Sequence, residues 1–82
     1  MFTPAIEVYQ MYENELNIGQ LGDDKTINGV GRKINLEQGA IDEGLFKNNM
    51  LNGFGRRIKS DGTFTTGFWN NGSLHGYALR VI

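Results

Sequence analysis

The chain lacks cysteine and contains one proline and one histidine in 82 residues. Without cysteine it can form neither a disulfide framework nor a thiolate metal site. Its formal net charge is −1, from 8 basic and 9 acidic residues, so we expect no general attraction to nucleic acid. No apolar run approaches the ~20 residues that a membrane helix needs. The first basic residue is Lys25, so we expect neither a secretory signal nor an Arg-rich transit peptide; a mature organelle protein fits this composition too.

Recognisable catalytic groupings are also lacking. The one histidine, His75, occupies the position that Asn28 and Asn52 hold in similar stretches, which favours a turn role. The pair Gly53 and Gly55 resembles the start of a dinucleotide fingerprint, but no third glycine or βαβ pattern follows. Asp23 and its acidic neighbour match no calcium-loop spacing. We therefore expect a protein that is not an enzyme and binds no cofactor and no metal.

Glycine is abundant, with 12 residues, and it marks an internal repeat. A shift of 23 residues superimposes Gly44 on Gly67, Phe46 on Trp69, and other positions in the same register. The repeated pairs include Gly39/Gly62, Leu51/Leu74, Gly53/Gly76, Phe54/Tyr77, Arg57/Arg80 and Ile58/Val81. An earlier copy fits with two extra residues. The sequence thus predicts units at about 14–38, 39–61 and 62–82, preceded by an N-terminal extension at 1–13.

Each unit has the pattern of two β-strands. In 40–46 and 54–58, side chains of alternating character have the period of two that is typical of strands. Asn-Asn, Asp-Gly and Asn-Gly pairs separate these segments, and such pairs favour tight hairpin turns. We therefore predict an antiparallel meander with one hairpin in each unit.

These residues resemble the MORN repeat, whose pattern is roughly Tyr-x-Gly-x-Trp, a short turn, and then Gly-x-Gly. The stretches EGLFKNNMLNGFG (43–55) and TGFWNNGSLHGYA (66–78) are the closest matches, and IGQLGDDKTINGVG (18–31) is a looser one. The first aromatic is replaced in every copy, by Asn17, Asp42 and Thr65. The resemblance implies an all-β fold: a twisted, single-layer antiparallel sheet of three hairpins, about six strands in total.

The repeated glycines within the first strand of each unit, such as Gly44 and Gly67, suggest close approach by a neighbouring ring or backbone. We predict that Leu21, Phe46 and Trp69 fold over adjacent strands. For Trp69, packing over Gly67 is favoured over the alternative, a hot spot at a binding surface.

The predicted sheet has two unlike faces. We expect one face to be broadly apolar and to bind protein, because a single layer cannot cover its own apolar face. Its candidate interaction residues are Ile41, Leu45, Phe54, Ile58, Phe64, Phe68, Tyr77 and Val81. Part of this face is expected to be covered by apolar residues of the extension, among them Phe2 and Ile6.

The other face carries a basic ladder of Lys33, Arg57 and Arg80 beside the rings. One interpretation is a site for phosphoinositide or an acidic partner. The other is a solvated face that is partly paired with Asp42 and Glu43.

Two functions follow as hypotheses. The first is a non-enzymatic structural or scaffold subunit that binds other protein subunits of a larger complex through its sheet. The second is a peripheral module that binds anionic lipid through the basic ladder. The resemblance implies a cytoplasmic location, with association to the cytoskeleton or a cilium.

Overall fold

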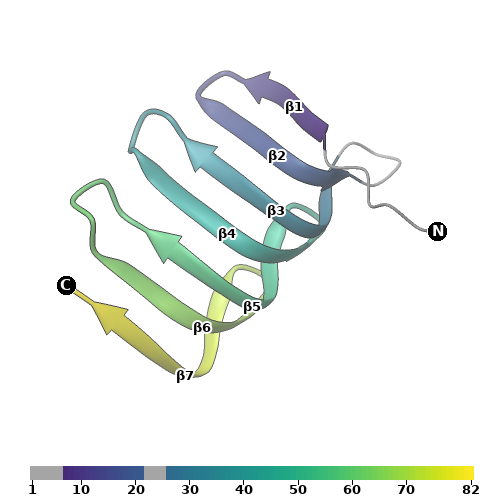
Figure 1. Ribbon diagram of the computed structural model, residues 1–82. Coiled ribbons are helices and arrows are strands. Elements are labelled where there is room, and N and C mark those ends of the chain that lie inside the picture. The colour runs from purple at the N-terminus through teal and green to yellow at the C-terminus, as the bar shows by residue number, and fades with distance from the viewer. Residues whose placement is uncertain (1–6, 22–25) are drawn as a thin grey trace.

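The computed structural model describes residues 7–21 and 26–82, and this part of the chain forms one antiparallel sheet. Its seven strands follow one another in chain order, as Figure 1 shows. The strands are β1 (Glu7–Tyr12), β2 (Glu15–Leu21), β3 (Ile27–Asn35), β4 (Ala40–Lys47), β5 (Met50–Ile58), β6 (Phe64–Asn70) and β7 (Ser73–Val81). The predicted all-β meander is therefore confirmed.

The three predicted hairpins are β2–β3, β4–β5 and β6–β7. The turns of the last two contain Asn48 and Asn49, and then Asn71 and Gly72, all with positive φ. Two successive residues of positive φ are what a tight hairpin turn requires.

Part of the N-terminal extension adds a strand to this meander. β1 pairs with β2 antiparallel, so from Glu7 onward the extension belongs to the sheet. The predicted covering of the apolar face by Phe2 and Ile6 lies outside the described residues, as does the Asp23 turn.

A row of small residues crosses the sheet from strand to strand. Gly19, Gly31, Gly44, Gly55, Gly67 and Ala78 are successive register partners. At Gly44 φ is 141°, and a Cβ there would lie 2.5 Å from the Gly55 Cα and 2.6 Å from the Phe54 carbonyl oxygen. The close neighbour at this glycine is thus the backbone of the next strand and not a ring.

The register shifts immediately after the glycine of each first strand, for example between Gly44 and Phe46. Corresponding shifts follow Gly19 and Gly67. Such irregularities bend a strand and increase its twist. In Figure 1 the strand ends near the 47–50 and 70–73 turns bend away from the rest of the sheet.

The bend encloses a small apolar core. Its buried members in the described part of the chain are Ile27, Phe46, Leu51 and Trp69, and Leu21 packs against them. A Cβ on Gly31 would lie 3.5 Å from Phe46 Cδ1, and a Cβ on Gly55 would lie 3.4 Å from Trp69 Cδ1. The rings therefore do fold over an adjacent strand, as predicted.

The particular partner predicted for Trp69 is wrong, because the glycine beneath its ring is Gly55 in β5 and not Gly67 in its own strand. Gly67 instead faces the backbone and side chain of Ala78 in β7.

Hydrogen bonds from the turns of the second and third hairpins reach the start of β3 and β5 in the preceding unit. Asn49 N donates to the Ile27 carbonyl at 3.1 Å, and Gly72 N donates to the Leu51 carbonyl at 2.9 Å. The Asn49 side chain also accepts from Ile27 N at 3.2 Å. Successive hairpins are thus joined both by strand pairing and by hydrogen bonds from their turns.

We predict that Gly44→Ala lowers the free energy of unfolding by roughly 1–3 kcal/mol more than Gly62→Ala does, because the added methyl overpacks the β4–β5 contact. Both glycines have positive φ, but a Cβ on Gly62 meets nothing within 4 Å. Urea unfolding of both variants measures the difference. Equal losses would show that backbone conformation alone, and not close approach, demands glycine at position 44.

Candidate functional site

The register divides the side chains between two faces. We call face A the side of the sheet that carries Phe46 and Trp69, and face B the opposite side, which carries Phe54 and Phe68. Side chains alternate between the faces along a strand, and register partners share a face.

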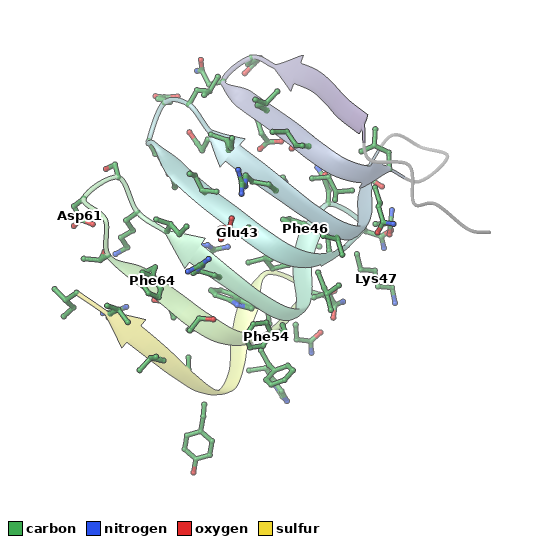
Figure 2. All side chains as sticks on the ribbon, viewed as in Figure 1. Glu43, Phe46, Lys47, Phe54, Asp61 and Phe64 are labelled. Carbon is green, nitrogen blue, oxygen red and sulfur yellow. The ribbon has the colours of Figure 1, made fainter. Side chains whose placement is uncertain are left out.

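Face B carries two apolar rows that run across the strands. The first row is a chain of register partners from β2 to β7: Leu16, Ile34, Ile41, Ile58, Phe64 and Val81. The second row comprises Val30, Leu45, Phe54 and Phe68. Figure 2 shows Phe64 and Phe54, one from each row, toward opposite ends of the strands.

The second row is largely open to solvent. Val30 is 57% exposed, Phe54 56% and Phe68 58%. The Phe54 and Phe68 rings touch edge to face, with centroids 5.6 Å apart and an interplanar angle of 77°. These rings pack against each other while leaving more than half of their surface exposed, and contiguous exposed apolar side chains are typical of binding surfaces.

The structure places the predicted interaction residues Ile41, Leu45, Phe54, Ile58, Phe64, Phe68 and Val81 in these two rows. Tyr77 differs from them, because it stands on the edge strand β7 with 99% of its surface exposed.

A groove of about 760 Å³ runs across face B near the glycine row, and its lining includes Val30, Phe54 and a line of polar side chains. That line is formed by the register partners Arg32, Glu43, Arg56 and Thr66. It separates the two apolar rows, so apolar and polar side chains alternate on face B along each strand.

Glu43 holds this polar line together. Its carboxylate lies 3.1 Å from an Arg32 nitrogen and 2.6 Å from an Arg56 nitrogen. The Arg56 guanidinium also lies 5.2 Å from the centroid of the Phe64 ring.

The predicted pairing of Glu43 with the basic ladder is therefore wrong, because Glu43 points to face B and the ladder to face A. Sequence reasoning missed Arg32 and Arg56 as groove residues. Their alternation with Lys33 and Arg57 was the available signal.

On face A, two members of the basic ladder have acidic partners. Lys33 Nζ lies 3.7 Å from Glu15, and Arg57 binds both carboxylate oxygens of Asp42, at 2.8 and 3.1 Å. The hydrogen bond to Asp42 raises the pKa of Arg57 above its ordinary value. The predicted pairing with Asp42 is thus confirmed for Arg57.

The guanidinium of Arg57 also lies 4.8 Å from the centroid of the Trp69 ring. Arg80 is exposed, and within residues 7–21 and 26–82 it makes no ion pair.

Other site types find little support in the described part of the chain. No group of three or more His, Cys, Asp or Glu side chains there could hold a metal ion. In the same residues, no helix is long and apolar enough to cross a membrane. His75 lies in β7 and is exposed, so it belongs to a strand and not to the turn expected for it.

We predict that Trp69→Phe lowers the free energy of unfolding by roughly 1–3 kcal/mol, because it removes a buried hydrogen bond. The Trp69 ring is 5% exposed, and its Nε1 donates to the Gly55 carbonyl at 3.0 Å. Urea unfolding checks this, with Phe68→Leu on the exposed face of the same strand as the control. Equal stability of Trp69→Phe and the parent would contradict the packing role.

Comparison with known families supports the repeat. The MORN repeat model matches residues 43–64 and 66–80, which contain all of β5 and most of β4, β6 and β7. The family model leaves the predicted first copy, at about 14–38, unmatched. No protein of curated function matches the chain. MORN repeats are generally non-catalytic and commonly take part in protein or membrane-lipid interactions. Residues 43–64 and 66–80 of this chain are thus similar to the MORN repeat.

Proposed function

We propose that this chain is a non-enzymatic structural or scaffold subunit that binds other protein subunits of a larger assembly through face B. The observation that carries the proposal is the second apolar row, in which Val30, Phe54 and Phe68 are each more than half exposed. A cytoplasmic assembly of the cytoskeleton or a cilium is the location that we propose for it.

The arrangement of face B suits a protein partner. Large aromatic side chains such as Phe54 and Phe68 supply much of the energy at interfaces when a partner excludes water from them. Between the two apolar rows, the Arg32–Glu43–Arg56 cluster offers groups that can form hydrogen bonds at fixed positions. Apolar contact would therefore supply affinity, and the polar line would set the register of the partner.

The same features argue against catalysis in the groove. Glu43 is the acidic side chain among the groove residues, and it is shared by two arginines. A carboxylate whose two oxygens are each bound by a guanidinium group is poorly placed to act as a general acid or base, because those contacts occupy the atoms that would exchange a proton.

Binding to anionic membrane through the basic ladder is the weaker candidate. Glu15 and Asp42 already neutralise Lys33 and Arg57. A surface that attracts anionic lipid usually needs several uncompensated cations close together, and Arg80 alone among the three remains without an acidic partner in the described residues.

We predict that replacing both Phe54 and Phe68 with Ser reduces recovery of the native partner by about tenfold or more, because the exposed rings form the centre of the interface. The measurement is an affinity purification of the tagged chain from its native cells, with the amount of each co-purified protein compared between variants. Urea unfolding should show that the double variant remains folded.

Lys59→Ser is the matched control, because Lys59 is exposed and lies in the 59–63 connection, beyond the end of β5. It should recover the partner as the parent does. A stoichiometric partner that is retained equally by the Phe54 and Phe68 double variant would contradict the proposal for face B.

We also predict that the chain shows no salt-sensitive co-sedimentation with vesicles of phosphatidylcholine containing phosphatidylserine or a phosphoinositide. The paired Lys33 and Arg57 leave too little free positive charge for such binding. Binding that is abolished in the Arg57→Glu/Arg80→Glu double variant would overturn this expectation and favour the membrane function.

A further inference from the structure

The outer edge of β7 repeats an arrangement that occurs twice within the sheet, where an apolar residue of one unit is covered by the next unit. At β7 no next unit of the described chain covers the equivalent residue. Ile27, Leu51 and Leu74 occupy equivalent positions in the three units. Ile27 is 0% exposed and Leu51 is 1% exposed, whereas Leu74 is 45% exposed. Ile27 and Leu51 are buried because each is followed by a unit that adds a ring, Phe46 or Trp69, to the same core. Within residues 7–21 and 26–82, no unit follows Leu74.

The small residues beside these positions follow the same series. Phe46 lies over Gly31 and Trp69 over Gly55, and the equivalent residue in the third unit is Ala78. Ala78 is exposed. The register that brings each ring into place sets Phe46 opposite Gly29 and Trp69 opposite Gly53. The next ring in this series would lie opposite Gly76, where a Cβ would meet nothing within 4 Å.

A hollow of about 370 Å³ lies on the Trp69 side of this edge. Trp69, Leu74 and Ser73 contribute to its lining together with the basic residues Arg57, Lys59 and Arg80. It is therefore partly apolar and carries positive charge.

Charge also distinguishes the third unit. Arg57 binds Asp42, its register partner in β4. The equivalent register partner of Arg80 in β6 is Thr65, which cannot form an ion pair. On its other side each basic residue faces the next unit, where Asp42 stands opposite Lys33 and Thr65 stands opposite Arg57. A strand added to β7 with an acidic residue at this register would supply the charge that Arg80 lacks.

We propose that the β7 edge receives an extended segment of a partner polypeptide that carries an acidic residue, a glycine and an aromatic residue at every second position. The pattern is that of Asp42, Gly44 and Phe46, which stand opposite Lys33, Gly31 and Gly29 in β3. On β7 the three equivalent positions are Arg80, Ala78 and Gly76. The segment would extend the sheet by main-chain hydrogen bonds, with its ring covering Leu74.

A second copy of this chain fits the edge less well. If two β7 strands pair antiparallel about Tyr77, Arg80 lies opposite Leu74. If they pair about Ala78, Ile82 lies opposite Leu74. Neither arrangement places an aromatic ring over the hollow or an acidic residue beside Arg80. The β7 strand of a second copy is therefore a poor match for this edge, and this site is separate from face B.

The test uses a synthetic peptide with the sequence of residues 38–48, QGAIDEGLFKN, capped at both ends and labelled with a fluorophore. We expect saturable binding to the full chain by fluorescence anisotropy, with amide hydrogen exchange slowed in β7 and unchanged in β3. Phe46→Ala in the peptide should weaken binding by about tenfold or more, because the ring is the main anchor.

Variants of the chain locate the site. Arg80→Glu should weaken binding of the peptide, and Asp42→Lys in the peptide should restore it, since the charges are then exchanged. Leu79→Ser, on the opposite face of β7, is the matched control and should bind as the parent does.

Three results would overturn the proposal: no binding of the peptide, equal binding of the Phe46→Ala peptide, or protection outside β7. A concentration-dependent dimer that is abolished by Leu74→Lys would also overturn it, by assigning the edge to a second copy. Because the peptide is read at β7, these results are independent of whether Phe54 and Phe68 bind a partner on face B.

Discussion

The packing of an aromatic ring over a glycine of the neighbouring strand is the interaction on which this sheet depends. A single layer has no second layer against which to bury apolar side chains. The chain solves this within the layer, because the absence of a side chain at Gly55 lets the Trp69 ring lie against the β5 backbone and donate to the Gly55 carbonyl. The strands bend after Gly44 and Gly67, and the bends bring the rings together with Ile27 and Leu51 in one core.

This solution stabilises one face and leaves the other open. All the buried apolar residues of the core lie on face A or at its turns. Face B has comparable apolar content, but its second row is more than half exposed except at Leu45, which is 42% exposed. Because the core on face A packs the units together, the exposed residues of the second row on face B are available for another role. Their position beside an ion-paired polar line is the reason for the proposal that they bind a partner.

Much of the fold follows from the sequence because glycine, turn asparagines and alternating side chains act locally. A period of two, which one sequence displays, predicts the hairpins. It also predicts which face carries Phe46, Trp69 and the eight interaction residues. Of those eight, only Tyr77 lies outside the two rows. The pairing of Glu43 depends instead on which strands become neighbours and in which register. The register shift after Gly44 also brings Leu51 under the rings, although Leu51 sits beside turn residues and looks like part of a loop. These features arise from tertiary geometry, so local pattern did not reveal them.

The most direct test of the account is covalent labelling of side chains in the isolated chain and in its native assembly, read residue by residue by mass spectrometry. The account predicts strong labelling of Phe54 and Phe68 in the isolated chain and marked protection of both in the assembly. Trp69 should be weakly labelled in both states, because it is already buried. If Phe54 and Phe68 are labelled equally in both states while another surface becomes protected, face B is not the interface.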